Sequence, residues 1–165
     1  MLLVPGSSGG RGNMALLQWN EKFSVGVRSI DEQHKVLIET LNELHHAIMK
    51  SEPRSSTRSL AASLLAYTRN HYVAEEQMLA NTDYPELKQH QALHRELLQM
   101  LQGYLASFER GGAANVDFLY VLRAWLTNHI LNVDGGYRAW LAEHGLPSLV
   151  AAAHSHTAGH TSNVS

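Results

Sequence analysis

The chain carries the run LAASLLAYTRNHYVAEEQM at residues 60–78, in which selected side chains recur every three or four positions. These side chains are Leu60, Leu64, Tyr67, His71, Glu75 and Met78. This period places them on one face of an α-helix, and the apolar members predict that the face is buried. The histidine and the glutamate therefore lie on a stripe that should point into the protein. Burial of such polar groups is unfavourable unless a partner compensates it.

Three further segments carry the same helical period. The first follows a capping box formed by Ser29 and Glu32, and its stripe consists of His34, Leu37, Leu41, Leu44 and Ile48. The next is expected to begin at Asp83, and its stripe consists of Leu87, His90, His94, Leu97, Leu101, Leu105 and Phe108. The last starts near Asn115, and its stripe consists of Phe118, Leu122, Trp125 and His129. Each of the four helices thus carries at least one histidine among its apolar residues.

Short connections make consecutive helices neighbours, so the sequence predicts an all-α fold, an up-down-up-down antiparallel four-helix bundle. We expect the bundle to span residues 19–147. Residues 1–18 are predicted to form a flexible, irregular N-terminal arm, because their first part is rich in glycine and serine and has no apolar period. Residues 148–165 are predicted to be a disordered C-terminal tail.

Composition narrows the function classes. A chain of 165 residues with 44% apolar residues fits one domain with a single core. The 13 basic and 15 acidic side chains nearly balance, which disfavours nucleic acid and anionic membranes as partners. There is neither an apolar run long enough to span a membrane nor a signal peptide at the N-terminus, so we expect a cytoplasmic protein. A monomer is the favoured oligomeric state.

Seven side chains of metal-binding type occupy or adjoin the helical stripes: His34, His71, Glu75, His90, His94, His129 and Asp134. A single HxxxH or HxxxE pair is weak evidence, since such pairs also occur by chance on helix surfaces. Here all four helices contribute, and the absence of cysteine leaves imidazole and carboxylate as the donors. A shared metal would compensate the burial of these groups, so we predict a buried two-metal centre.

One pair in this set does not fit a regular helix. His129 and Asp134 are five residues apart, which turns their side chains about 140° away from each other. Gly135 and Gly136 follow directly. We therefore expect a bulge or a helix end near these residues that swings Asp134 toward the metals.

Four motifs, IDEQHK (30–35), HYVAEE (71–76), HQALH (90–94) and HILNVD (129–134), resemble the hemerythrin family, and most closely its single-domain bacterial members. The likeness extends from about Trp19 to Leu141. It implies a cofactor of two iron ions joined by an oxo or hydroxo bridge. His90, His94 and His129 would hold one iron, His34 and His71 would hold the other, and Glu75 and Asp134 would bridge them. The iron with two histidines would keep an open position for dioxygen.

The resemblance also nominates residues around bound oxygen: Leu37, Tyr72, Trp125, Leu126 and Ile130. The four apolar residues are equally consistent with an ordinary bundle core. Tyr72 departs from the phenylalanine that is usual in the family, and its hydroxyl would either donate to bound oxygen or admit water. Glu76 is expected to lie in solvent or just outside the ligands, and His45 and His144 are expected to be exposed.

The predicted function is therefore reversible dioxygen binding rather than enzymatic turnover, for oxygen storage or for delivery to an oxygen-consuming enzyme. One alternative is a sensor of oxygen, nitric oxide or redox state that acts through a protein partner. Another is a di-iron enzyme that acts on peroxide or nitric oxide. A purely structural zinc bundle ranks below these, because seven ligands exceed the four that one closed site needs.

Overall fold

A computed structural model describes residues 15–113 and 115–144 of the chain. The elements are a short 3-10 helix η1 (Glu21–Phe23), then α1 (Arg28–Met49), α2 (Arg54–Ala80), α3 (Leu87–Glu109), α4 (Val116–Asn128), a π turn η2 (His129–Val133) and α5 (Asp134–Glu143). The described residues contain no strand. Within them, no helix combines the length and the apolar character that a membrane crossing requires.

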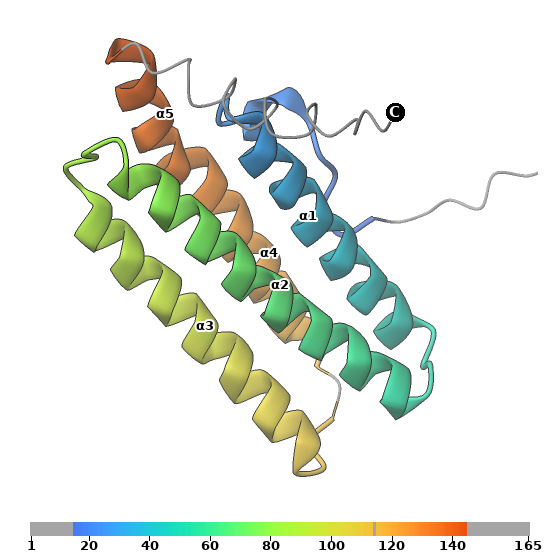
Figure 1. Cartoon of the computed structure of the whole chain (residues 1–165). Helices are drawn as coiled ribbons and strands as arrows, with labels where there is room; N and C mark the ends of the chain where they lie inside the picture. The colour runs from blue at the N-terminus through green and yellow to red at the C-terminus, as the bar shows by residue number, and fades with distance from the viewer. Residues whose placement is uncertain (1–14, 114, 145–165) are drawn as a thin grey trace, which may run out of the picture.

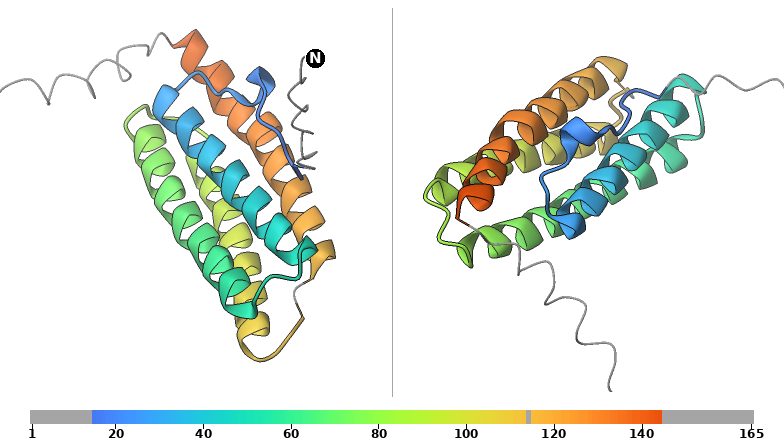
Figure 2. Two further views of the ribbon diagram at one scale, coloured as in Figure 1. Left: turned by 90° about the vertical axis from the view of Figure 1, so that its right-hand side faces the viewer. Right: turned by 90° about the horizontal axis from the view of Figure 1, so that it is seen from above.

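The helices run alternately up and down as an antiparallel bundle, which confirms the predicted fold (Figure 1). The helix α1 packs against α2 and α4, and α2 packs against α3. The helix α4 continues through η2 into α5, so these three elements form the fourth rod of the bundle. The segment before α1 lies along the side of the bundle, between α1 and the fourth rod (Figure 2).

Two apolar clusters fill the bundle, one on each side of the histidines. Ile30 of α1 belongs to one cluster, and Leu37 belongs to the other. On the fourth rod, Leu122 and Ile130 divide in the same way. His34 and His129 fall between these pairs in the sequence. His34, His129 and the polar side chains at the same level therefore form a layer, called the histidine layer below, with one apolar cluster on each side of it.

The N-terminal boundary of the bundle differs from the prediction. Leu16 and Leu17 are buried, with 7% and 8% of their surfaces exposed. The Leu17 backbone N–H donates to Asn42 Oδ1 at 3.0 Å, and Asn42 Nδ2 donates to the Leu17 carbonyl at 2.8 Å. An arm ending at residue 18 is therefore wrong for residues 15–18, which belong to the packed domain. Residues 1–14 and the expected tail at 148–165 lie outside the described part.

Two expected helix starts are also corrected. The helix α1 begins at Arg28 after Val27, without a side-chain cap, so Ser29 and Glu32 form no capping box. The carboxylate of Asp31 instead accepts hydrogen bonds from Ser24 Oγ at 2.7 Å and from Val25 N at 2.8 Å. The helix α3 begins at Leu87 rather than Asp83, because Asp83 has φ of 55°, a left-handed conformation that a right-handed helix cannot include.

Candidate metal centre

The seven side chains of the predicted ligand set meet at one level of the bundle. They come from α1, α2, α3 and the fourth rod, and each has no more than 3% of its surface exposed. Every histidine in the set turns its Nε2 atom toward another member. The helical periods read from the sequence thus place all seven groups in one interior space.

One compact group contains three histidines and a glutamate: Glu75, His90, His94 and His129. Glu75 Oε2 lies 3.1 Å from the Nε2 atoms of both His90 and His94. The Nε2 atoms of His94 and His129 are 3.1 Å apart. One potential ligand atom from each residue lies within 4.8 Å of all the others, so the group can hold a metal ion.

A second compact group consists of His34, His71 and the same Glu75. Its histidine rings meet edge to face, with centroids 4.7 Å apart. Asp134 lies across both groups, because Oδ2 is 3.4 Å from His34 Nε2 and Oδ1 is 3.2 Å from His129 Nε2. Glu75 and Asp134 therefore stand between a position with three imidazoles and a position with two.

The π turn explains how His129 and Asp134 reach the same space. In this turn the Asp134 N–H donates to the His129 carbonyl, five residues back. The side chain five positions after His129 therefore lies on the same side of the helix, as the side chain four positions later does in an α-helix.

The distortion was expected beside Gly135 and Gly136, but both glycines lie inside the regular helix α5. Gly136 has a separate role, since a Cβ atom there would lie 3.1 Å from the Tyr84 hydroxyl oxygen.

Several atoms in this layer have no hydrogen-bond partner: both ring nitrogens of His34, Nδ1 of His90, and both carboxyl oxygens of Asp134. Each buried polar group left without a partner costs about 1–3 kcal/mol. Ligation by a cation would compensate His34 Nε2 and the Asp134 oxygens. Imidazole nitrogen and carboxylate oxygen suit iron, and zinc or manganese accept the same donors. The residues present therefore fit a metal centre.

The electrostatic environment keeps two of the imidazoles, those of His34 and His129, in the neutral form that binds metals. Burial, assisted by the neighbouring His71, lowers the pKa of His34 to about 3. Burial and His94 lower the pKa of His129 to about 2. Metal ions bind neutral imidazole, so these side chains need no deprotonation near pH 7.

The two carboxyl groups differ in the metal-free centre. Burial raises the pKa of Glu75, but the hydrogen bonds from His90 and His94 outweigh it and hold that pKa well below its ordinary value. Burial and the nearby charge of Glu75 raise the pKa of Asp134 well above its ordinary value. The metal-free centre thus favours the ionised form of Glu75, and a bound cation would favour the ionised form of Asp134 as well.

Three side chains just outside the seven hold them in place. Gln33 Oε1 lies 2.9 Å from Nδ1 of His71, and Glu76 Oε1 lies 2.8 Å from Nδ1 of His94. The hydroxyl of Tyr137 donates to Glu75 Oε1 at 2.7 Å. The expectation for Glu76 agrees with this position. The roles of Gln33 and Tyr137 were not predicted from the sequence. The one feature that could have indicated them is that each lies within three residues of a predicted ligand.

An apolar cavity adjoins the histidine layer. Each of the four rods contributes a lining residue that lies three positions along the chain from one of the predicted histidine ligands. These residues are Leu37, Thr68, Leu97 and Leu126. Tyr72 also lines it, and the Tyr72 ring stacks on His94 with centroids 3.5 Å apart and an angle of 4° between planes. Three of the five residues expected around oxygen, Leu37, Tyr72 and Leu126, thus share one cavity.

The other two nominated residues, Trp125 and Ile130, do not line this cavity. Trp125 stacks on the ring of His129, with centroids 4.4 Å apart. Ile130 packs into the apolar cluster on the opposite side of the layer. His45 was expected to be exposed, but only 8% of its surface is exposed and it packs edge to face against Tyr120 of α4. His144 is exposed, as expected.

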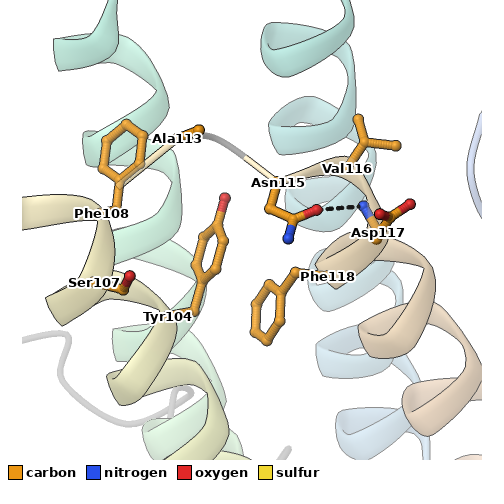
Figure 3. Close-up of a pocket in the computed structure, with 8 residues that line it drawn as sticks. All are labelled: Tyr104, Ser107, Phe108, Ala113, Asn115, Val116, Asp117 and Phe118. Atoms are coloured by element: carbon orange, nitrogen blue, oxygen red, sulfur yellow. Dashed lines mark hydrogen bonds between the residues drawn. The ribbon is translucent and has the colours of Figure 1, made fainter. Parts of the chain in front are cut away.

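A second cavity, an open cleft of about 580 Å³, lies where α3 leads into α4 (Figure 3). The rings of Tyr104 and Phe118 stack there with centroids 4.1 Å apart. Asn115 in its wall accepts a hydrogen bond from the Asp117 N–H and so caps the start of α4. Its described lining contains no histidine, and both groups of potential metal ligands found in the described part of the chain lie in the histidine layer.

An antiparallel four-helix bundle with imidazoles and carboxylates gathered in its core defines a class of helical metal-binding proteins. The sequence model of the hemerythrin HHE cation binding domain matches residues 25–141 of this chain. The chain therefore belongs to the hemerythrin family, and it is a hemerythrin-type iron protein.

Individual relatives agree with this assignment. A bacteriohemerythrin of Stenotrophomonas maltophilia is 30% identical over 79% of this chain and 85% of its own length. The myohemerythrin of Theromyzon tessulatum is 27% identical over 75% of this chain and 92% of its own. A crystal structure of wild-type hemerythrin superposes with a TM-score of 0.72 at 30% identity, covering 76% of this chain and 97% of that one.

Proposed function

We propose that this protein binds dioxygen reversibly at two iron ions, for storage or for delivery to oxygen-consuming enzymes. In this proposal one ion is held by His90, His94 and His129, and the other by His34 and His71. Glu75 and Asp134 bridge the two. The observation that carries the proposal is that Glu75 belongs to both compact groups of potential ligands.

The unequal numbers of histidines support a binding role. A position with two imidazoles and the shared carboxylates has fewer donors than its neighbour, which leaves room for an exogenous ligand. Iron, when bound, supplies the reversible electron transfer that dioxygen binding requires. The chain itself supplies five imidazoles and only two carboxylates, and this low donor charge favours the ferrous state.

The apolar cavity supports dioxygen as the ligand. Leu37 and Leu126 in its wall offer no hydrogen bonds, so water gains little by entering. The Thr68 hydroxyl donates to the Leu64 carbonyl at 2.7 Å and is thereby satisfied within its own helix. Tyr72 is the remaining polar group in the lining. An apolar space of about 20 Å³ next to the proposed irons would limit the loss of bound oxygen to solvent.

Anaerobic loading with ferrous iron followed by exposure to air tests this proposal. We expect two irons per chain and a visible absorption band that appears in air and disappears when oxygen is removed. Glu75→Ala should abolish the band, whereas Glu43→Ala, on the exposed surface of α1, should preserve it. Two irons retained in the Glu75 variant would contradict the bridging role. Sustained consumption of oxygen, peroxide or nitric oxide would instead indicate an enzyme.

A further inference from the structure

Two of the five inner histidines have a side-chain acceptor on their outer ring nitrogen. His94 Nδ1 is paired with Glu76, and His71 Nδ1 is paired with Gln33. When a metal takes the Nε2 lone pair, the ring carries its hydrogen on Nδ1, and an oxygen at this place accepts that hydrogen and orients the ring. The two acceptors thus perform the same orienting task at different metal positions.

The acceptors differ in charge. Glu76 presents a carboxylate, which draws the Nδ1 hydrogen toward itself. The Nε2 atom of His94 thereby becomes a stronger electron-pair donor to a metal. The amide of Gln33 is neutral and has a weaker effect on His71. Glu76 is also held from its other side, because Gln91 Nε2 donates to Oε2 at 3.1 Å. The carboxylate is therefore fixed in place, with 28% of its side-chain surface exposed.

Ring packing reinforces the difference. Tyr72 stacks on His94 and Trp125 stacks on His129, so two rings of the three-histidine position are held by flat aromatic neighbours. At the other position, neither nitrogen of His34 has a hydrogen-bond partner. The three-histidine position also contains an unpartnered nitrogen, Nδ1 of His90. Its advantage therefore consists of the stacking on His94 and His129, the carboxylate beside His94 and one more imidazole.

We propose that Glu76 makes the His90, His94 and His129 position the tighter of the two, so that the centre fills there first and empties there last. Glu76 acts as a positioning residue through His94. This inference rests on the ligand assignment of the proposed function and adds an order of metal loading to it. Removal of such an outer partner typically weakens metal binding about 10–100-fold.

Metal release from the loaded full-length chain tests the order. The chain is loaded with Co²⁺, and transfer of the metal to an excess of a chromophoric chelator is followed over time. We expect two phases of equal amplitude, one for each position. Glu76→Gln should accelerate the slow phase by about 10–100-fold and leave the fast phase unchanged. Glu96→Gln, at an exposed position of α3, is the matched control and should change neither phase.

Gln33→Glu provides an independent arm, because the added carboxylate should slow the fast phase alone. Glu76→Asp keeps the charge, so the rate of its slow phase should lie closer to that of the wild-type chain than the rate of Glu76→Gln does. The inference would be overturned if the Glu76→Gln variant released Co²⁺ at the same rates as the wild-type chain, or if both phases were accelerated equally. The number of ions separates the two hypotheses. Fewer than two Co²⁺ per wild-type chain would overturn the ligand assignment as well, whereas two ions released in one phase would overturn only the order.

Discussion

The π turn between His129 and Val133 leads to a prediction about chain length at this point. In an α-helix, five residues of separation turn two side chains about 140° apart, whereas four residues leave them about 40° apart. Deletion of Asn132 should convert the π turn into an α turn with His129 and Asp134 still on one face. Insertion of an alanine after Asn132 makes the separation six residues and turns the side chains about 120° apart.

The deletion should cost little stability. Asn132 is exposed, and its only side-chain hydrogen bond in the described structure is donated to Asn128 Oδ1 at 2.8 Å. An exposed hydrogen bond of this kind contributes about 1 kcal/mol at most. Side chains after the deletion should still point to the same side of the helix, so Tyr137 should still reach Glu75. The insertion, in contrast, should move both Asp134 and Tyr137 out of the centre.

Elemental analysis of the iron-loaded variants, together with far-ultraviolet circular dichroism, measures both effects. We expect the deletion variant to stay helical and to bind as much iron as Asn132→Ala, which keeps the chain length. The insertion variant should remain helical but lose bound iron. If the deletion abolished iron binding in a folded protein, or the insertion preserved it, the proposed alignment by the π turn would be refuted.

Three further predictions concern single groups. Tyr137→Phe keeps the buried ring but removes the donor to Glu75, and should lower the free energy of unfolding by about 1–3 kcal/mol in urea titrations. Tyr72→Phe should slow autoxidation of the oxygenated iron protein, followed by loss of its visible band; an unchanged rate would mean that the hydroxyl points away. Folding lowers the pKa values of His34 and His129 below 6.5, so the unfolded chain binds more protons, and stability is present above pH 6.5 and lost on acidification toward pH 3. Burial also lowers the pKa of His71, whereas the raised pKa of Asp134 acts in the opposite direction. The histidines outnumber the aspartate, so metal-free protein should lose on the order of 1–2 kcal/mol per pH unit between pH 6 and pH 5, which chemical denaturation at several pH values measures.

The sequence was sufficient to predict the bundle and the convergence of the seven side chains, because both depend on the helical period. His90 and His94 face inward for the same reason as Leu97, since each occupies the apolar stripe of α3. The distortion at His129 was predictable because a regular helix cannot bring Asp134 beside it. These conclusions need only local geometry and the cost of burying polar groups.

What the sequence did not predict depends on contacts between distant segments. His45 appears exposed on its own helix, but Tyr120 from α4 packs against it. The Leu17 backbone exchanges hydrogen bonds with the Asn42 side chain, 25 residues away, a contact that no local pattern indicates. Tyr137 reaches Glu75 across 62 residues. No local period reveals which of several nearby residues will make such a contact.

The position of the histidine layer between two apolar clusters links metal binding to the stability of the bundle. Without metal, the layer contains buried atoms of His34, His90 and Asp134 that have no hydrogen-bond partner, and the apolar clusters on either side limit access of water to them. Replacing these groups with apolar side chains would remove this cost but also the metal site. A metal bound at His34 Nε2 and the Asp134 oxygens would compensate those atoms, and the proposed ligand set would join α1, α2, α3 and the fourth rod through one layer. A ligand that binds only the folded chain stabilises it. In the proposed centre, His34 and Asp134 therefore weaken the empty bundle and would strengthen the loaded one.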